Sequence, residues 1–210
     1  MGGSGAKFGE SREAKNEQIV FSKISQTANV IREQQYETAM IFDPNTGEET
    51  RKRITQFSGN NVIVPMDGTT YMKTLVHNHP SGGCFSGEDL YMSKMLAGTI
   101  WAVTKTHNFI FRWNSPSNIT EKWASEFKDK VNKMHDDMHK KAKQEWDKKH
   151  GSVDEVIKRC YEKHEITVKE MNNILEARGP GIKELYHKKT IDWFKNNASK
   201  YGYKFSARRV

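Results

Sequence analysis

The hydrophobic periodicity of the chain changes near residue 118, and this change is the strongest constraint on its fold. Over much of the chain before that point, from residue 36 onward, apolar residues gather in short β-type runs separated by turn sequences, such as 36–42 and 108–113. After it, apolar residues recur every three or four positions from Trp123 to Trp146. Alternation is typical of strands, and a period of about 3.6 residues is typical of helices. The pattern therefore predicts an α/β fold with a helical C-terminal part.

The N-terminal part is predicted to contain a helix, a hairpin and further strands. Apolar residues at helical spacing indicate an amphipathic helix over residues 11–33. Asp43-Pro44-Asn45-Thr46-Gly47 has the composition of a tight turn and would join the two strands of the hairpin. The expected strands are residues 36–42, 51–57, 61–65, 74–77, 100–105 and 108–113, with a second helix over 86–97.

The C-terminal part is predicted to be entirely helical. The apolar row over residues 123–146 indicates one long amphipathic helix that ends near Gly151. Ser152 and Thr167 each stand three residues before a glutamate, the pattern of a capping box, and would begin two more helices. Gly179-Pro180-Gly181 is expected to break the chain before a last helix.

The charge is distributed unevenly between the two parts of the chain. The formal net charge is +8; residues 1–118 hold 12 Lys and Arg against 11 Asp and Glu, whereas residues 119–210 hold 22 against 15. The expected organisation is a flexible lead over 1–10, an α/β domain over 11–118, and a basic, all-α extension over 119–210. The lysines are interpreted as the solvent face of a helical bundle, with contact to nucleic acid or an acidic partner as the alternative.

Membrane and disulfide-rich secreted proteins are disfavoured classes. No apolar run approaches the ~20 residues of a membrane-spanning helix, and the N-terminus lacks the apolar segment of a signal peptide. The two cysteines, Cys84 and Cys160, cannot form a disulfide framework. The sequence therefore predicts a cytoplasmic protein.

The strongest functional signal runs from the end of a predicted strand into the next helix. On an extended chain alternate side chains point the same way, so His77 and His79 present both imidazoles on one side. Pro80 keeps His79 out of the helical conformation. Ser86 can cap a helix whose first turn carries Asp89, which would return a carboxylate to the imidazoles. We therefore expect a metal site with these two histidines and this aspartate as ligands.

Two imidazoles and one carboxylate suit Zn²⁺, which keeps a fourth position for water at catalytic sites. A hydrolytic site also needs a general base for that water. Glu37 is the predicted base, because on its strand it shares the inward face with apolar neighbours. Glu48 and Glu49 follow the turn and are weaker candidates, while Glu33 is assigned to the preceding helix.

The arrangement resembles the JAMM metalloproteases, in which a glutamate on an early strand precedes His-x-His-Pro and Ser-x-x-Asp. The wording His-Asn-His-Pro-Ser-Gly-Gly is closest to bacterial and phage versions, some of them attached to toxin or phage-head polypeptides. The resemblance covers roughly residues 34–113 and implies an MPN-like mixed β-sheet flanked by helices. Five residues separate Pro80 from Ser86, one fewer than is common in the family.

The resemblance also implies a role for each site residue. His77, His79 and Asp89 would bind Zn²⁺, Glu37 would activate water, and Ser86 would help to hold the oxyanion. The implied function is a zinc-dependent peptidase or isopeptidase. Its substrate would be a protein or peptide, and it could work within a larger phage or toxin assembly.

Alternatives remain for individual residues and for the function. His135 and His139 lie one helical turn apart, but the residue after the first is Asp136 and not the glutamate of a zincin, so solvated histidines are expected. A nucleophilic Cys84 is disfavoured, because the nearby histidines are better used as metal ligands. Alternative functions are a catalytically inactive MPN-like module that binds protein or nucleic acid through its basic helices, and a metal-dependent nuclease.

Overall fold

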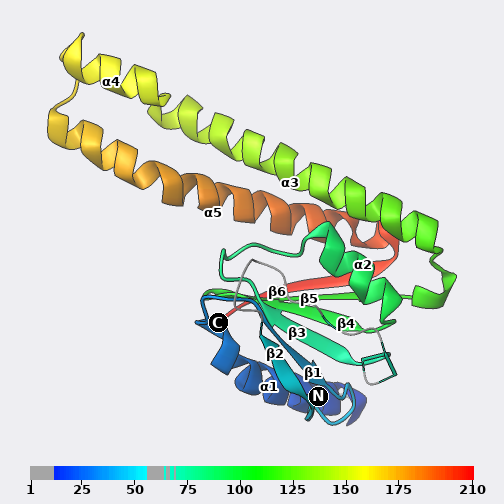
Figure 1. Cartoon of the computed structure of the whole chain (residues 1–210). Helices are drawn as coiled ribbons and strands as arrows, with labels where there is room; N and C mark the ends of the chain where they lie inside the picture. Colours follow the sequence, from blue (N-terminus) through cyan, green and yellow to red (C-terminus); the bar gives the residue numbers. More distant parts are fainter. Residues whose placement is uncertain (1–11, 56–63, 65–66, 69) are drawn as a thin grey trace, which may run out of the picture.

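A six-stranded mixed sheet lies at the centre of the structure, with helices on both of its faces (Figure 1). This computed structural model describes residues 12–55, 64, 67–68 and 70–210. The expected flexible lead over 1–10 lies outside the described residues. So does the short strand expected at 61–65, except for Val64, which is not in a strand.

The elements follow the predicted order over most of the chain. The strands are β1 (Thr38–Phe42), β2 (Glu49–Thr55), β3 (Thr74–Asn78), β4 (Thr99–Val103), β5 (His107–Trp113) and β6 (Tyr203–Arg209). The helices are α1 (Arg12–Arg32), α2 (Gly87–Met95), the 3-10 helix η1 (Pro116–Asn118), α3 (Glu121–His150), α4 (Val153–Tyr161) and α5 (Val168–Tyr201). The strand order is β2-β1-β3-β4-β5-β6, in which only β3 and β4 are parallel.

The parallel pair β3–β4 requires a crossover, and α2 provides it. The register pairs His77 with Ala102 and Asn78 with Val103, so both strands end at the same end of the sheet. The loop that follows β3 leads directly into α2. The predicted two histidines and the first turn of α2 are therefore brought to one end of the sheet.

The two faces of the sheet bury different residues, in the alternation that strands impose. Met40 and Phe42 of β1 pack with α1 residues such as Ile24 and Ile31, which confirms the predicted amphipathic helix. Ala39 and Ile41 face the other way, into the larger core beneath α2, α3 and α5. The second face is the one that carries the side chain of His77.

The prediction that residues 119–210 are all helical is wrong at their end. Gly202 ends α5 in the left-handed conformation, at φ +71°, and the following strand β6 pairs with β5 along its full length. Tyr203 and Phe205 alternate with polar residues and pack on the larger core. This alternation is a strand signal, which the strong helical pattern before it obscured. The C-terminal part thus completes the same sheet.

The expected break at Gly179-Pro180-Gly181 is also wrong, because α5 runs through it. A proline inside a helix removes one backbone hydrogen bond, which is a local loss. Gly181 brings a compensating contact: a Cβ there would lie 1.8 Å from Cζ3 of Trp146. The indole of α3 therefore lies directly against the backbone of α5, and packing between the two helices overrides the local signal.

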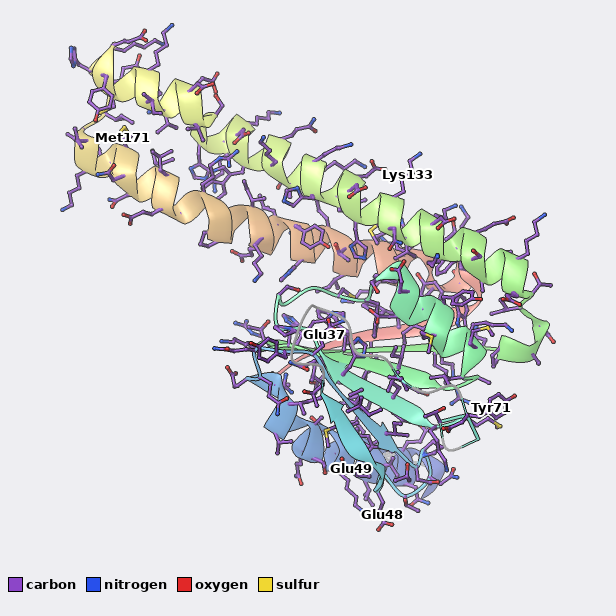
Figure 2. All side chains as sticks on the ribbon, viewed as in Figure 1. Glu37, Glu48, Glu49, Tyr71, Lys133 and Met171 are labelled. Atoms are coloured by element: carbon purple, nitrogen blue, oxygen red, sulfur yellow. The ribbon has the colours of Figure 1, made fainter. Side chains whose placement is uncertain are left out.

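We refer to α3, α4 and α5 together as the helical arm. Figure 1 shows α3 and α5 side by side, crossing one face of the sheet and projecting beyond it. Val156 and Cys160 of α4 are buried with Met171 of α5. Figure 2 shows Met171 at the far end of the arm. The predicted capping boxes at Ser152 and Thr167 begin α4 and α5, as expected. Among the described helices, none has the length and apolar character needed to cross a membrane.

Candidate metal centre

Three side chains predicted as metal ligands converge at the end of β3. The Nε2 atoms of His77 and His79 lie 2.8 Å apart. Oδ1 of Asp89 lies 3.2 Å from Nε2 of His77, and Oδ2 lies 3.4 Å from Nε2 of His79. The exposed fraction of the side chain is 3% for His77, 10% for His79 and 18% for Asp89. This buried group could hold a metal ion.

Asp89 is oriented by the cap of its own helix. Ser86 is the N-cap of α2, and its hydroxyl accepts a hydrogen bond from the backbone N–H of Asp89. The backbone N–H and the hydroxyl of Ser86 in turn donate to Oδ2 of Asp89, at 2.7 and 2.9 Å. This is a reciprocal capping box with aspartate in the third position. The five-residue loop between Pro80 and Ser86 is therefore long enough for Asp89 to reach the imidazoles.

His79 is held by backbone groups on two sides. The backbone N–H of His79 donates to the carbonyl of Val103, and the ring Nδ1 of His79 lies 3.0 Å from the carbonyl oxygen of Gly83. Because a carbonyl can only accept, Nδ1 donates its proton to Gly83, and Nε2 is the ring nitrogen that faces the site. The chain returns to this position through Gly82, whose φ of +80° strongly favours glycine.

The electrostatics of the group favour a bound cation. Burial alone would lower the pKa of His79, but the hydrogen bond and charge of Asp89 raise it to about 9. Burial opposes ionisation of Asp89, yet the two imidazoles hold the pKa of its carboxyl well below the usual range. The site therefore keeps a carboxylate beside nitrogen atoms that a proton or a metal ion can occupy.

The geometry of the group fits a tetrahedral ion. Bonds of about 2.1 Å to a tetrahedral ion place two ligand atoms about 3.4 Å apart. Each imidazole lies close to this distance from one carboxylate oxygen of Asp89, at 3.2 and 3.4 Å, whereas the two Nε2 atoms are 2.8 Å apart and would have to separate slightly around an ion. Nδ1 of His77 is buried and has no hydrogen-bond partner within the described part of the chain. The polar contacts of that ring are therefore made through Nε2, inside the site.

Glu37 directly precedes β1 and lies at the same end of the sheet. The register between β1 and β3 ends with the pair Ala39 and His77, and Glu37 and His79 each lie two residues from that pair at this end of the sheet. The charge of Glu37 contributes to the raised pKa of His79. Figure 2 shows Glu37 at the end of the sheet nearest the helical arm, with Glu48 and Glu49 at the opposite end. The two weaker candidates are therefore remote from the triad.

The other residues considered from the sequence fall outside the triad. Glu33 follows α1 and forms an exposed ion pair with Lys105. Burial raises the pKa of the Cys84 thiol far above its usual value, which opposes formation of a nucleophilic thiolate. The hydroxyl of Ser86 contacts Asp89, so its predicted contact with an oxyanion would require that hydrogen bond to rearrange.

Asn78, between the two histidines, is a site residue that the sequence analysis missed. It is fully buried; its Oδ1 accepts from the N–H of Thr38, and its Nδ2 donates to the carbonyls of Gln34 and Tyr36. It therefore fixes the segment that carries Glu37. The alternation of β3 could have indicated this residue, since the side chain between two site residues must point to the opposite face.

His135 of α3 is the second residue that the sequence analysis misjudged. It was expected to be solvated, but its Nε2 lies 2.7 Å from the carbonyl oxygen of Phe85, in the loop before α2. Its Nδ1 lies 2.7 Å from the hydroxyl of Tyr186 on α5. His139, one turn later, is exposed as expected. No local sequence signal reveals that the helical arm folds back over this loop.

Comparison of the chain with protein-family models, with curated proteins and with solved structures finds no match. The site is therefore defined by its own geometry: two imidazoles and a carboxylate that meet in a buried position, with a further carboxylate at the same end of the sheet.

Proposed function

We propose that the protein is a zinc-dependent hydrolase of the JAMM type that cleaves a peptide or isopeptide bond. The observation that carries this proposal is the convergence of His77, His79 and Asp89 from two separate elements at distances of 2.8 to 3.4 Å. Two nitrogens and one carboxylate oxygen form a ligand set of catalytic zinc sites, which leave one position for water. A site built only for structure would ordinarily be closed by a fourth protein ligand.

The proposed chemistry divides between the metal and the protein. Zinc, when bound, would supply a water molecule whose pKa is lowered to about 7. His77, His79 and Asp89 would hold the ion, and the hydrogen bond from Nδ1 of His79 to Gly83 would keep that ring in the ligating tautomer. Ser86 would stabilise the oxyanion through its hydroxyl.

Glu37 would accept the proton from the water and return it to the leaving amine. Its position just before β1, at the same end of the sheet as His79, supports this role, and it is not one of the three residues that could hold the ion. The charge of Glu37 also contributes to the raised pKa of His79, which supports this assignment. Asn78 would act as a positioning residue by holding the segment from Gln34 to Thr38.

Metal analysis and a hydrolysis assay test the proposal together. We expect about one zinc per chain in the wild type, and loss of that zinc in His77→Ala. A fluorogenic peptide library and a set of isopeptide-linked substrates should be cleaved by the wild type. Glu37→Gln should keep its zinc and lose at least about 100-fold in activity, as expected for a general base.

The matched control is Glu48→Gln, a carboxylate on the same hairpin but remote from the triad, which should keep both zinc and activity. A wild-type protein that takes up no zinc would support the inactive interaction module instead. Cleavage of nucleic acid but of no peptide, lost in Glu37→Gln, would support the metal-dependent nuclease.

A further inference from the structure

His135 and Tyr186 form a half-buried polar pair that the proposed chemistry does not use. They come from the two long helices of the arm, His135 from α3 and Tyr186 from α5, and both are partly shielded from solvent. Nδ1 of His135 lies 2.7 Å from the Tyr186 hydroxyl, and Nε2 lies 2.7 Å from the carbonyl oxygen of Phe85. All polar atoms of the imidazole are therefore engaged, and none points at the triad.

The direction of both hydrogen bonds follows from the carbonyl of Phe85, which ends the chain of contacts. The carbonyl of Phe85 can only accept, so Nε2 of His135 donates to it. Burial keeps the imidazole neutral by lowering the pKa of His135, so its Nδ1 must accept from the hydroxyl of Tyr186. Tyr186 therefore donates to His135, and His135 donates to the loop before α2.

The peptide group that receives this bond also holds the metal ligand. Its carbonyl belongs to Phe85 and its N–H to Ser86, and that N–H donates to Oδ2 of Asp89 at 2.7 Å. A hydrogen bond to the oxygen of a peptide polarises its N–H and strengthens the bond that the N–H donates. The chain of donors thus runs from Tyr186 through His135 and one peptide group to Asp89.

A second contact shows that α3 holds the start of α2 in place. The N–H of Gly87 donates to Oδ1 of Asn132, one turn before His135, at 2.9 Å. The amide of Asn132 donates to the carboxylate of Glu88. Two consecutive peptide groups before Asp89 are therefore bound to side chains of the same arm helix.

We propose that His135 and Tyr186 are positioning residues for Asp89, acting through the Phe85–Ser86 peptide group. This inference rests on the metal site proposed above. By fixing Oδ2, the chain of hydrogen bonds leaves Oδ1 directed at the Nε2 of His77, 3.2 Å away. The helical arm is then part of the metal centre, because the ligand geometry depends on it.

The test compares zinc affinity and the visible spectrum of the cobalt-substituted protein across four variants. His135→Ala should weaken zinc binding by about 10- to 100-fold, as outer hydrogen-bond partners of ligands do. Tyr186→Phe, which removes one oxygen and keeps the ring, should weaken it about threefold to tenfold. His135→Gln should restore part of the loss, because its amide can donate to the carbonyl of Phe85.

The matched control is Lys141→Ala, which removes an exposed side chain from the same helix α3; His139 is unsuitable, because its ring lies edge-on to that of Tyr186. Its zinc affinity should stay within about twofold of wild type, and its cobalt spectrum should be unchanged. His135→Ala and Tyr186→Phe should both change the ligand-field bands of cobalt, which a general loss of stability in a still folded protein does not do.

The Ser86 amide provides a reading that needs no metal. In the metal-free protein its proton resonance should move upfield in Tyr186→Phe, because the bond to Asp89 weakens. If the wild type takes up no zinc, the proposed function fails. The chemical shift of the Ser86 amide proton then still tests whether the helical arm fixes the position of Asp89. An unchanged Ser86 resonance, or zinc affinities of His135→Ala and Tyr186→Phe within twofold of wild type, overturns the inference.

Discussion

Gly87, the first residue of α2, lies so close to α3 that even a methyl group should not fit. A Cβ at this position would lie 2.3 Å from the carbonyl oxygen of Lys128 and 2.7 Å from Oδ1 of Asn132. Favourable heavy-atom contacts are about 3.5 Å, so Gly87→Ala must move α2 away from α3 by roughly 1 Å. The nearest atom belongs to the backbone of α3, which cannot rotate aside as a side chain can.

This displacement should affect both stability and metal binding. Overpacking of this kind costs about 1–3 kcal/mol, and each kcal/mol lowers the melting temperature of a chain of this size by roughly 2–4 °C. Asp89 is two residues further along α2 and moves with it. Zinc affinity should therefore fall about tenfold or more, as when the support of a metal ligand is lost.

Thermal unfolding of the metal-free protein and zinc competition with a chelator measure the two effects. The control is Gly179→Ala in α5, where a Cβ would meet nothing within 4 Å. Alanine is the better helix former by up to about 1 kcal/mol, but Pro180 follows directly and disfavours a Cβ on a helical residue before it. The two effects oppose each other, so the melting temperature should change little, and zinc binding should be normal. A Gly87→Ala protein with wild-type melting temperature and zinc affinity would refute the packing argument.

Two further predictions concern Asn78 and pH. Asn78→Ala leaves the buried N–H of Thr38 without its acceptor; we expect a loss of about 2–4 kcal/mol in urea unfolding and slower peptide hydrolysis, with zinc content retained. In the metal-free protein His79 has a raised pKa of about 9, so its stabilising contribution is complete below the unfolded value of 6.5 and lost as pH rises through 9. The contribution of His79 is the free energy of unfolding of the wild type minus that of His79→Gln, both measured in urea. This difference should be roughly 3 kcal/mol smaller at pH 9.5 than at pH 6. The same difference at both pH values would contradict the raised pKa. Zinc must displace the same proton, so its affinity should rise about tenfold per pH unit up to pH 9 and not level off near 6.5.

Local patterns were sufficient to predict much of the fold and the convergence of the three side chains that could hold a metal ion. The helical spacing before residue 33, the turn at Asp43, the helix cap at Ser86 and the capping boxes at Ser152 and Thr167 each depend on a few neighbouring residues. Asp43 accepts from the N–H groups of Asn45 and Thr46, which is how an aspartate forms a turn of this kind. The triad is also local, because its three residues lie within thirteen positions of one another and depend on a strand followed by a capped helix.

Features that depend on contacts distant in sequence could not be predicted. Strand β6 pairs with β5 only because α5 returns the chain to the sheet. Pro180 remains inside a helix because Trp146 packs against Gly181. His135 reaches Phe85 because α3 crosses the loop fifty residues before it in sequence. In each case tertiary packing overrides the local preference, and no single segment carries the information.

The most direct test of the central claim is anomalous diffraction at the zinc edge from crystals of the zinc-loaded protein. A zinc ion held as proposed gives one strong peak about 2.0–2.2 Å from Nε2 of His77, Nε2 of His79 and a carboxylate oxygen of Asp89, with a fourth ligand that is not protein. A peak at another place in the molecule, or no peak at full zinc occupancy in solution, would contradict the assignment of these three residues as the metal centre.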